Sequence, residues 1–288
     1  MLLLTKVSFS QNISFDNVLP LVSLLQIGNT SSSGFFVAFD DNILFVTAKH
    51  SLINEYFDKE NKIQRVPIDN LIKIVTYSKD VTTNNPDTLI VDFGAACLAN
   101  YMRYALVKDV VILFIGKINV INDSLASLVY QKYVRRLNKS TWLNFLTIDN
   151  FIFFKNVHVG DDIIMAGYPK SLGSALQNQY NFDRPLFRKG IVAGKTYELG
   201  NVIVDCPSYG GNSGGPIFVE KGIVKNNVIE KGYKLIGLVS GFVPFNEVWY
   251  NQNYQYQNVN INNSGFSEIV PIDIIYDLYY NGLKQFLK

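Results

Sequence analysis

An all-β fold is predicted from the way short apolar segments alternate with polar turns along the chain. The strand-like segments of the first half are 34–39, 43–47, 71–77, 88–93 and 110–115. Those of the second half are 163–168, 187–194, 201–205, 216–219, 234–240 and 266–270. The chain has 288 residues, near the upper end of single-domain size, and its 48% hydrophobic residues can supply more than one sheet core.

Three stretches depart from this alternation. In 123–150 the apolar residues have near-helical spacing, which predicts a helical insertion; they are Leu125, Leu128, Val129, Tyr133 and Leu137. After Pro271 the apolar residues predict an amphipathic C-terminal helix; they are Ile272, Ile275, Tyr276, Tyr279, Leu283 and Phe286. The stretch 246–263 is rich in Asn, Gln and Tyr, and is expected to be a solvated loop.

The motif Gly211-Asn212-Ser213-Gly214-Gly215-Pro216 places one serine among glycines. A run of this composition is often only a turn. Here it lies between two strand-like segments, and glycine at position 211 permits a positive φ. The N–H groups of Gly211 and Ser213 can then converge on one point, as in an oxyanion hole, while the serine hydroxyl serves as a nucleophile.

A serine nucleophile needs a base, and the chain has only two histidines. His50 ends the apolar strand-like segment 43–47 and its small-residue turn, where a catalytic group is expected. His158 has no acidic or nucleophilic motif beside it, so we expect a solvated or structural role.

A carboxylate should orient the base and stabilise its cation. Asp109 precedes the continuous apolar run 110–115, which predicts a buried strand with a carboxylate at its mouth. The alternatives are that Asp109 only caps a turn, or that Asp92 is the partner. Asp92 is the weaker candidate because its strand is interrupted sooner.

The order His50, Asp109, Ser213 is that of chymotrypsin-type triads, whereas α/β-hydrolases and subtilisins use other orders. With these motifs the chain resembles trypsin-like serine proteases, in particular bacterial trypsin-like and HtrA-type peptidase domains. The matching stretches are Thr47-Ala48-Lys49-His50, Lys108-Asp109-Val110-Val111-Ile112-Leu113, 211–216 and Gly237-Leu238-Val239-Ser240-Gly241. Weaker matches at 159–169, 190–192 and 265–271 extend the resemblance over most of the chain.

The resemblance implies one protease domain, 1–288, with two six-stranded antiparallel β-barrels of the chymotrypsin type. The first barrel would occupy about 1–121 and the second 151–271, with the helical insertion, 122–150, between them. The helix 272–288 is expected to pack on the second barrel. The 17 residues after Pro271 are too few for the PDZ domain that usually accompanies HtrA-type enzymes.

The resemblance also implies a role for each matching residue. Ser213 would be the nucleophile, His50 the general base and then acid, and Asp109 the group that orients His50. The amides of Gly211 and Ser213 would form the oxyanion hole. The hydroxyl of Ser240 would help to hold Asp109, and the backbone of 240–242 would pair with an extended substrate as an added strand. The stretch 246–263 leaves directly from that strand and could serve as an exosite.

Two departures concern activation. Asn212 stands where trypsin-type zymogens have an aspartate that pairs with a freshly cut N-terminus, and no Ile-Val-Gly-Gly start is present. We therefore expect no activation by N-terminal cleavage.

The specificity pocket would have two walls. The near wall is 206–210, including Ser208 and Tyr209, and the far wall is Ser240, Gly241 and Phe242. Pro207 stands where trypsin has its basic-residue-selecting aspartate, although a shifted loop could bring Asp205 inward. We therefore predict cleavage after small or medium uncharged residues.

The function predicted is a serine endopeptidase acting on protein or peptide substrates, with dedication to one protein partner left open. The alternative is a catalytically weak or inactive protease-fold binding module. No cofactor or metal is expected. A net charge of +2 indicates neither a nucleic-acid nor a membrane partner, and the oligomeric state is left open.

The cellular compartment is predicted from cysteine usage and the absence of apolar segments. Cys97 and Cys206 are expected to be free thiols, although one bridge between them is an alternative. No convincing signal peptide and no apolar run of the ~20 residues that span a membrane is present. These features favour a cytoplasmic protein.

Overall fold

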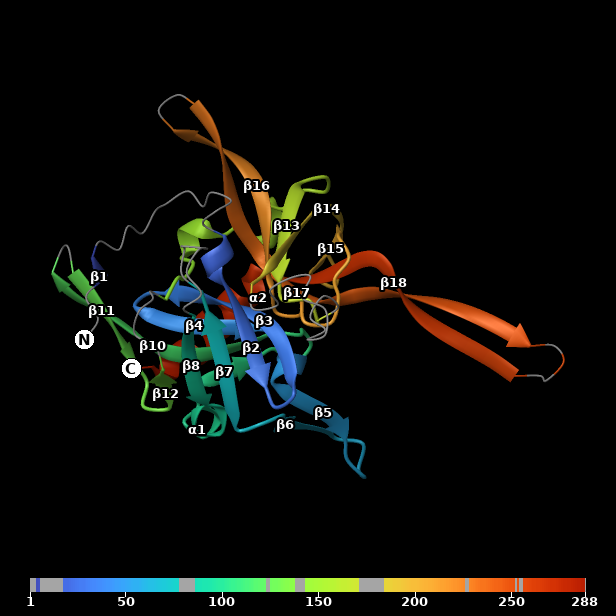
Figure 1. The fold of residues 1–288 in the computed structure, drawn as a ribbon, viewed down its shortest axis with the longest axis horizontal. Helices are drawn as coiled ribbons and strands as arrows, with labels where there is room; N and C mark the ends of the chain where they lie inside the picture. The colour runs from blue at the N-terminus through green and yellow to red at the C-terminus, as the bar shows by residue number, and fades with distance from the viewer. Residues whose placement is uncertain are drawn as a thin grey trace.

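The computed structural model describes residues 4–5, 18–77, 86–122, 125–137, 143–170, 184–225, 228–251, 253 and 256–287. The fold is all-β, with two β-sheet domains and a C-terminal helix, as the sequence predicts (Figure 1). No helix in this described part of the chain has the length and apolarity that crossing a bilayer requires.

The first domain is built on the predicted strands. Five of them, together with β2, which was not predicted, lie in the order β10-β4-β3-β2-β7-β8. Their bounds are β2 Val22–Ile27, β3 Thr30–Phe39, β4 Asn42–Thr47, β7 Leu71–Thr76, β8 Asp87–Asp92 and β10 Val111–Asn122. Further short strands are β1 Leu4–Thr5, β9 Met102–Tyr104, β11 Leu125–Tyr130 and β12 Val134–Arg136, which complete a ten-stranded sheet. A separate hairpin is formed by β5 Ile53–Phe57 and β6 Ile63–Pro67.

This first sheet is curled, but among the described residues no strand pair closes it into the expected six-stranded barrel. Closure would require β8 to pair with β10, but other strands occupy both edges. β9 pairs with β10 through Val111 opposite Tyr104, and β12 pairs with β8 through Val134 opposite Val91. Because each edge already has a partner, the backbone groups are satisfied without closure.

The second domain is a closed six-stranded barrel, which confirms the prediction. Its strand order is β13-β14-β15-β18-β17-β16. The bounds are β13 Asp162–Gly167, β14 Leu186–Thr196, β15 Asn201–Asp205, β16 Pro216–Lys225, β17 Val228–Asn251 and β18 Tyr256–Pro271. Apolar side chains from alternate positions fill its interior, including Val192, Val204, Ile217 and Ile269.

The prediction of a helical insertion at 122–150 is wrong. Its described residues form β11, β12 and a single 3-10 turn, Ile148–Asn150. β11 extends the β10 hairpin with Gly116 opposite Tyr130, and Arg136 of β12 pairs with the buried Asp87 of β8. The spacing of the apolar residues suited a helix, but backbone pairing to two open sheet edges decided the structure.

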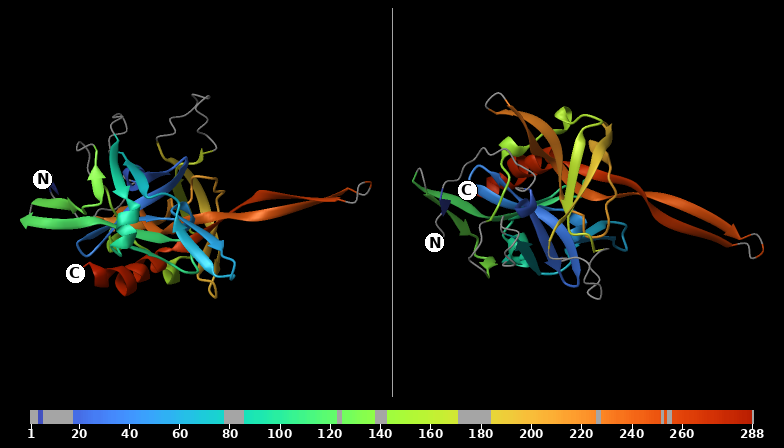
Figure 2. Two further views of the ribbon diagram at one scale, coloured as in Figure 1. Left: turned by 90° about the horizontal axis from the view of Figure 1, so that it is seen from below. Right: turned by 45° about the horizontal axis from the view of Figure 1, so that its top comes forward.

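The prediction of a solvated loop at 246–263 is also wrong, because the described residues of this stretch form paired strands. β17 and β18 continue far beyond the barrel as a two-stranded ribbon, with Phe245 opposite Asn262 and Val248 opposite Val259. We call this ribbon, residues 242–251 and 256–265, the arm. It projects away from both domains in every view (Figures 1 and 2).

The C-terminal helix exists as predicted, but its main aromatic contact is with the first domain. α2 Ile272–Leu278 continues into a π-helical turn, Tyr279–Leu283, and a 3-10 turn, Lys284–Phe286. Tyr279 stacks on Phe39 of β3 at 4.9 Å, and its hydroxyl accepts a hydrogen bond of 2.7 Å from Asn42. The helix is therefore part of the core that joins the two domains.

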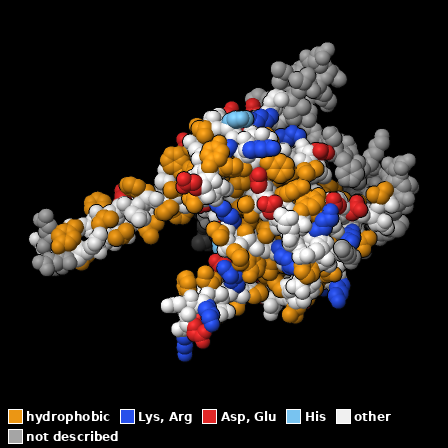
Figure 3. All heavy atoms as spheres, turned by 180° about the vertical axis from the view of Figure 1, so that it is seen from behind, with side chains coloured by type: hydrophobic (Ala, Val, Ile, Leu, Met, Phe, Trp, Pro, Cys, Tyr) orange, Lys and Arg blue, Asp and Glu red, His pale blue; other side chains and the backbone are white. Residues whose placement is uncertain are grey.

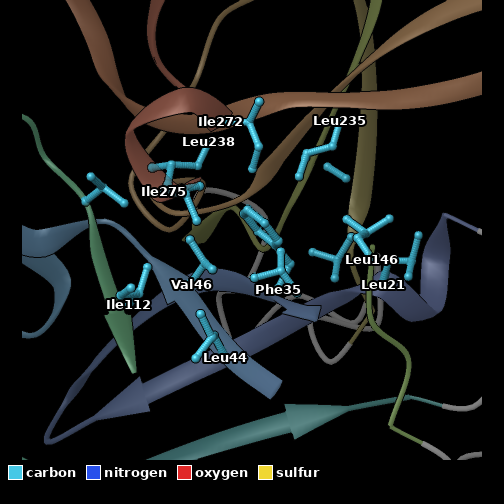
Figure 4. Packing of buried hydrophobic residues seen from close by; sticks show 14 of the residues in the cluster. Leu21, Phe35, Leu44, Val46, Ile112, Leu146, Leu235, Leu238, Ile272 and Ile275 are labelled. Carbon is cyan, nitrogen blue, oxygen red and sulfur yellow. The ribbon is translucent and has the colours of Figure 1, made fainter. Parts of the chain in front are cut away.

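That shared core draws side chains from both sheets. Phe35, Val46 and Ile112 of the first domain lie in one cluster with Leu238 of the second and Ile275 of the helix (Figure 4). Other short helices are α1 Phe93–Leu98 and the 3-10 turns Leu19–Leu21, Lys49–Ser51 and Phe154–Asn156. The continuous core holds the two domains in a defined relation, so a site at their junction can be preorganised.

Candidate active site

His50 and Asp109 lie side by side at the ends of two paired strands. β4 ends at Thr47, and His50 occupies the 3-10 turn that follows. Asp109 lies just before β10, whose Val111 is opposite Thr47. Asp109 Oδ1 accepts the His50 backbone N–H at 2.9 Å, and its Oδ2 lies 2.6 Å from His50 Nδ1. The two contacts set both the position and the orientation of the imidazole.

A third group from the second domain completes this arrangement. The hydroxyl of Ser240 donates to Asp109 Oδ2 at 3.1 Å. His50 remains 55% exposed at its side chain, whereas Asp109 is 22% exposed. The carboxylate is therefore held on the protein side of the ring, and the rest of the imidazole faces the solvent.

The hydrogen bonds shift both ionisations in the direction that favours an ion pair. The hydrogen bond to Asp109 raises the pKa of His50 above its usual 6.5, against the opposing effect of burial. Burial would raise the pKa of Asp109, but the bonds from His50 and Ser240 hold it below its usual value. Asp109 therefore stays ionised near neutral pH and stabilises a proton on the imidazole.

The loop around Ser213 has the backbone geometry that its glycines permit. Gly211 has a φ of +98° and Gly214 a φ of +81°, both in the left-handed region. A Cβ on Gly211 would lie 2.2 Å from the carbonyl oxygen of Tyr168. In the described part of the chain, the amides of Gly211 and Ser213 donate to no acceptor, whereas those of Asn212, Gly214 and Gly215 do. Backbone N–H groups that are free to donate are what an oxyanion site requires.

Two serines of the first domain anchor this loop, and the sequence analysis did not single them out. The carbonyl of Ser213 accepts hydrogen bonds from the Ser33 amide at 2.9 Å and from the Ser32 hydroxyl at 2.6 Å. The Ser33 hydroxyl donates to the carbonyl of Gly211 at 2.7 Å. The only signal in the sequence was the polar run 30–33 before an apolar strand, which suggests no particular partner.

The same contacts bring the Ser213 loop beside His50. Ser32 also bonds the hydroxyl of Ser51, the residue after His50, at 2.7 Å. On the other side, the Gly214 amide donates to the carbonyl of Val239, which precedes Ser240. Among the residues that the structure describes, the Ser213 hydroxyl makes no hydrogen bond to His50. In free enzymes this contact is often long and tightens when substrate binds.

Asp92, the alternative carboxylate, and His158, the second histidine, make other contacts. Asp92 caps α1 by accepting the Ala95 amide at 2.8 Å. The side chain of His158 is 72% exposed and lies 3.8 Å from Asp161. Neither residue contacts the Asp109, His50 and Ser213 group in the described interactions.

Asn212 holds the serine loop from inside the protein. Its side chain is buried, and its Oδ1 accepts the amide of Tyr209 at 3.1 Å. Its Nδ2 lies so close to Gly167 that a Cβ there would approach it to 2.7 Å. A neutral amide is thus packed in the interior behind the serine loop.

The expected near wall of the pocket contacts the arm and β14. Ser208 is buried, and its carbonyl accepts a hydrogen bond from Asn263 of the arm at 2.6 Å. Tyr209 is exposed, and the guanidinium of Arg188 lies over its ring, 4.5 Å from the ring centroid, a contact that the sequence did not predict. Asp205 lies within β15, where it is exposed and pairs with Ile191 and Phe266.

The two cysteines are free, as expected. Cys97 is half-buried and Cys206 is buried, and desolvation raises the pKa of both thiols to about 11. Thiols with such pKa values are weak nucleophiles at neutral pH.

No protein-family model and no curated protein matches the sequence. Solved structures of serine proteases resemble its fold. Deg5 has 14% identity and a TM-score of 0.44, with 93% of each chain covered. Protease Anisep from Arthrobacter nicotinovorans has 14% identity and a TM-score of 0.43, with 92% of this chain and 96% of that one covered.

The HtrA-type protease AlgW with tripeptide has 13% identity and a TM-score of 0.37. The alignment covers 92% of this chain but only 62% of AlgW, so this chain spans less than two thirds of that protein. The likeness concerns the fold, and the chemistry has to be argued from this chain's own residues.

Proposed function

We propose that the protein is a serine endopeptidase that forms an acyl-enzyme through Ser213, His50 and Asp109, all within one protease domain. The observation that carries the proposal is the two-point hydrogen bonding of Asp109 to His50. The Asp109–His50 pair lies beside a serine loop in which two amides have no acceptor among the described residues. A partly buried carboxylate that orients a histidine beside a serine is the arrangement that activates a hydroxyl.

Each group then has a role in the reaction. His50 Nε2 takes the proton of the Ser213 hydroxyl as Oγ attacks the substrate carbonyl, and Asp109 stabilises the imidazolium that forms. The oxyanion accepts hydrogen bonds from the amides of Gly211 and Ser213. His50 gives its proton to the leaving amine, the C–N bond breaks, and water then hydrolyses the acyl-enzyme by the same steps.

The substrate is proposed to be an extended polypeptide that pairs with the backbone of Ser240, Gly241 and Phe242. Pro207 carries no charge and Asp205 is part of a strand, so the pocket should accept small or medium uncharged residues before the scissile bond. Cleavage of a peptide library measures this preference. A strong preference for Arg or Lys that Asp205→Asn removes would show that Asp205 forms the pocket base.

A fluorophosphonate probe tests the proposed function directly. The purified protein should be labelled, and mass spectrometry of its peptides should place the adduct on Ser213. Asp92→Asn is a matched control, since asparagine also caps helices well and the carboxylate is remote from the site. If the folded protein is not labelled and hydrolyses no peptide, the alternative of a protease-fold binding module is the better description.

A further inference from the structure

One edge of β17 is open from the candidate active site outward. β16 covers this edge as far as Pro216 opposite Leu238. On the same edge, the carbonyl of Val239 accepts a hydrogen bond from the Gly214 amide, and the amide of Val239 donates to the carbonyl of Gly215. From Ser240 to Asn251, β17 pairs only with β18 among the described residues. Unpaired backbone groups of an edge strand are a template for a further strand.

The arm has two faces, because side chains alternate along each strand, and both faces carry exposed apolar side chains. The register places Val248 opposite Val259 and Tyr250 opposite Gln257, with Ile261 opposite Asn246 on the same face. This apolar face is uncovered: Val248, Val259, Tyr250 and Ile261 are 56%, 47%, 63% and 67% exposed. The opposite face carries Phe245, Glu247 and Trp249 facing asparagines.

Charge restricts the ligands that this surface can attract. Glu247 is the only charged residue in 242–265. Apolar and uncharged side chains follow the arm in the space-filling view (Figure 3). Such a surface favours an uncharged apolar segment over a basic or acidic one.

From these observations we infer that the arm extends the substrate site, and that it binds an extended, uncharged segment of the substrate with apolar residues at alternate positions. This inference rests on the proposed function. The open edge begins at Ser240, whose hydroxyl contacts Asp109, so a chain bound there continues into the active site. Continuity with that site favours a substrate strand over a second copy of the protein.

The direction of a substrate strand that pairs antiparallel with β17 follows from the direction of β17. β17 runs outward from the site, so an antiparallel partner runs inward, and the residues along the arm precede the scissile bond. From Phe242 to Asn251 the edge is about 30 Å long, at ~3.4 Å per residue, which accommodates about nine residues of an extended substrate.

Binding to the Ser213→Ala protein tests the inference without any need for hydrolysis. The probes are two fluorescein-labelled peptides of about twelve residues that alternate Val and Asn in opposite phase, and a short peptide of about four residues. We expect at least one long peptide to bind about tenfold more tightly than the short one.

Two arm variants locate the effect. Phe245 is opposite Asn262, so replacing 246–261 by an Asn-Gly turn shortens the arm and keeps Asn263 on the pocket wall. Val248→Thr with Tyr250→Thr keeps strand-forming residues but removes the apolar face. In both variants the long peptide should bind only about one- to twofold more tightly than the short one. Glu247→Gln, on the opposite face, should keep the tenfold difference in affinity.

The other outcomes are distinct. Equal binding of long and short peptides, or an advantage that survives arm shortening, overturns the inference. A change from oligomer to monomer on shortening, by light scattering, with unchanged peptide binding would assign the arm to a second copy instead. If peptide binding depends on the arm but the folded protein with Ser213 intact is not labelled by a fluorophosphonate, the proposed function is rejected, and with it the assignment of the peptide as substrate.

Discussion

The two domains supply the candidate active site in different ways. The first domain contributes His50 and Asp109 as side chains at adjacent strand ends, joined by hydrogen bonds of 2.9 and 2.6 Å. The second contributes Ser213 on a loop whose shape depends on positive φ at Gly211 and Gly214. In the first domain the chemistry depends on functional groups, and in the second it depends on the path of the backbone.

This difference predicts which substitutions each domain tolerates. Side chains at strand ends can change without moving the strands, so substitutions there should alter chemistry more than stability. Glycines in the left-handed region cannot acquire a Cβ without strain, so substitutions there should move the backbone donors. Substitutions in the two domains should therefore differ in their effects on kcat and on stability.

Loss of the nucleophile or the base should have the largest effect. We expect Ser213→Ala and His50→Ala each to lower kcat by on the order of 10⁶, because the two residues act as a unit. The double variant should be scarcely worse than either single one. Steady-state peptide hydrolysis measures this, with the exposed His158→Ala as control. Additive losses would show that the residues act independently.

Asp109→Asn should lower kcat by on the order of 10⁴, since an amide favours the wrong imidazole tautomer. The fold should remain, because an amide fits the same volume. Asp92→Asn should be close to wild type. Near-normal hydrolysis by Asp109→Asn, with Asp92→Asn inactive, would show that the carboxylate has been misassigned.

Gly211→Ala tests the contribution of the backbone conformation in the second domain. The added Cβ would lie 2.2 Å from the carbonyl oxygen of Tyr168, so the loop must shift its oxyanion donors. We expect kcat to fall by about 10²- to 10³-fold, as for the loss of one such donor.

The matched control is Gly160→Ala. Gly160 has a similar φ of +89° but nothing within 4 Å of the added Cβ. It should lose about 1 kcal/mol of stability or somewhat more, with kcat unchanged. Equal kinetic losses in the two variants would mean that general strain, rather than the oxyanion geometry, is responsible.

Ser33→Ala tests the contact between the domains. Without its hydroxyl, the carbonyl of Gly211 loses a hydrogen bond of 2.7 Å, and the serine loop is held less firmly against His50. We expect kcat to fall about 10- to 100-fold, with a smaller change in KM. Ser23→Ala is the control, since the buried Ser23 hydroxyl has no partner among the described residues. A loss of thermal stability without a loss of kcat would assign Ser33 a purely structural role.

The pH dependence should be the smallest effect. The hydrogen bond to Asp109 raises the pKa of His50, so the neutral base forms only above the usual value of 6.5. kcat/KM should therefore rise about tenfold per pH unit below that raised pKa and level off above it. In Asp109→Asn the residual activity should level off at a lower pH. A profile that levels off at the same pH in both proteins would contradict this electrostatic coupling.

The local features of the molecule could be predicted from the amino-acid sequence. The alternation of apolar and polar residues predicted the positions of most strands, because side chains on opposite faces of a sheet need opposite chemistry. The glycines around Ser213, the small-residue turn before His50 and the strand after Asp109 were visible because each reflects a local backbone or burial requirement. The helical register after Pro271 was visible for the same reason.

Which strands pair with the edges of each sheet depends on contacts between residues that are distant in the sequence. β9 and β12 kept the first sheet open, and 125–130 became a strand on β10, because hydrogen-bond partners distant in sequence override local spacing. The arm formed because 246–251 and 256–261 pair with each other, which Asn-rich composition does not reveal. The contacts of Ser32 and Ser33 with the serine loop span about 180 positions, and such pairings exist only after the two domains pack.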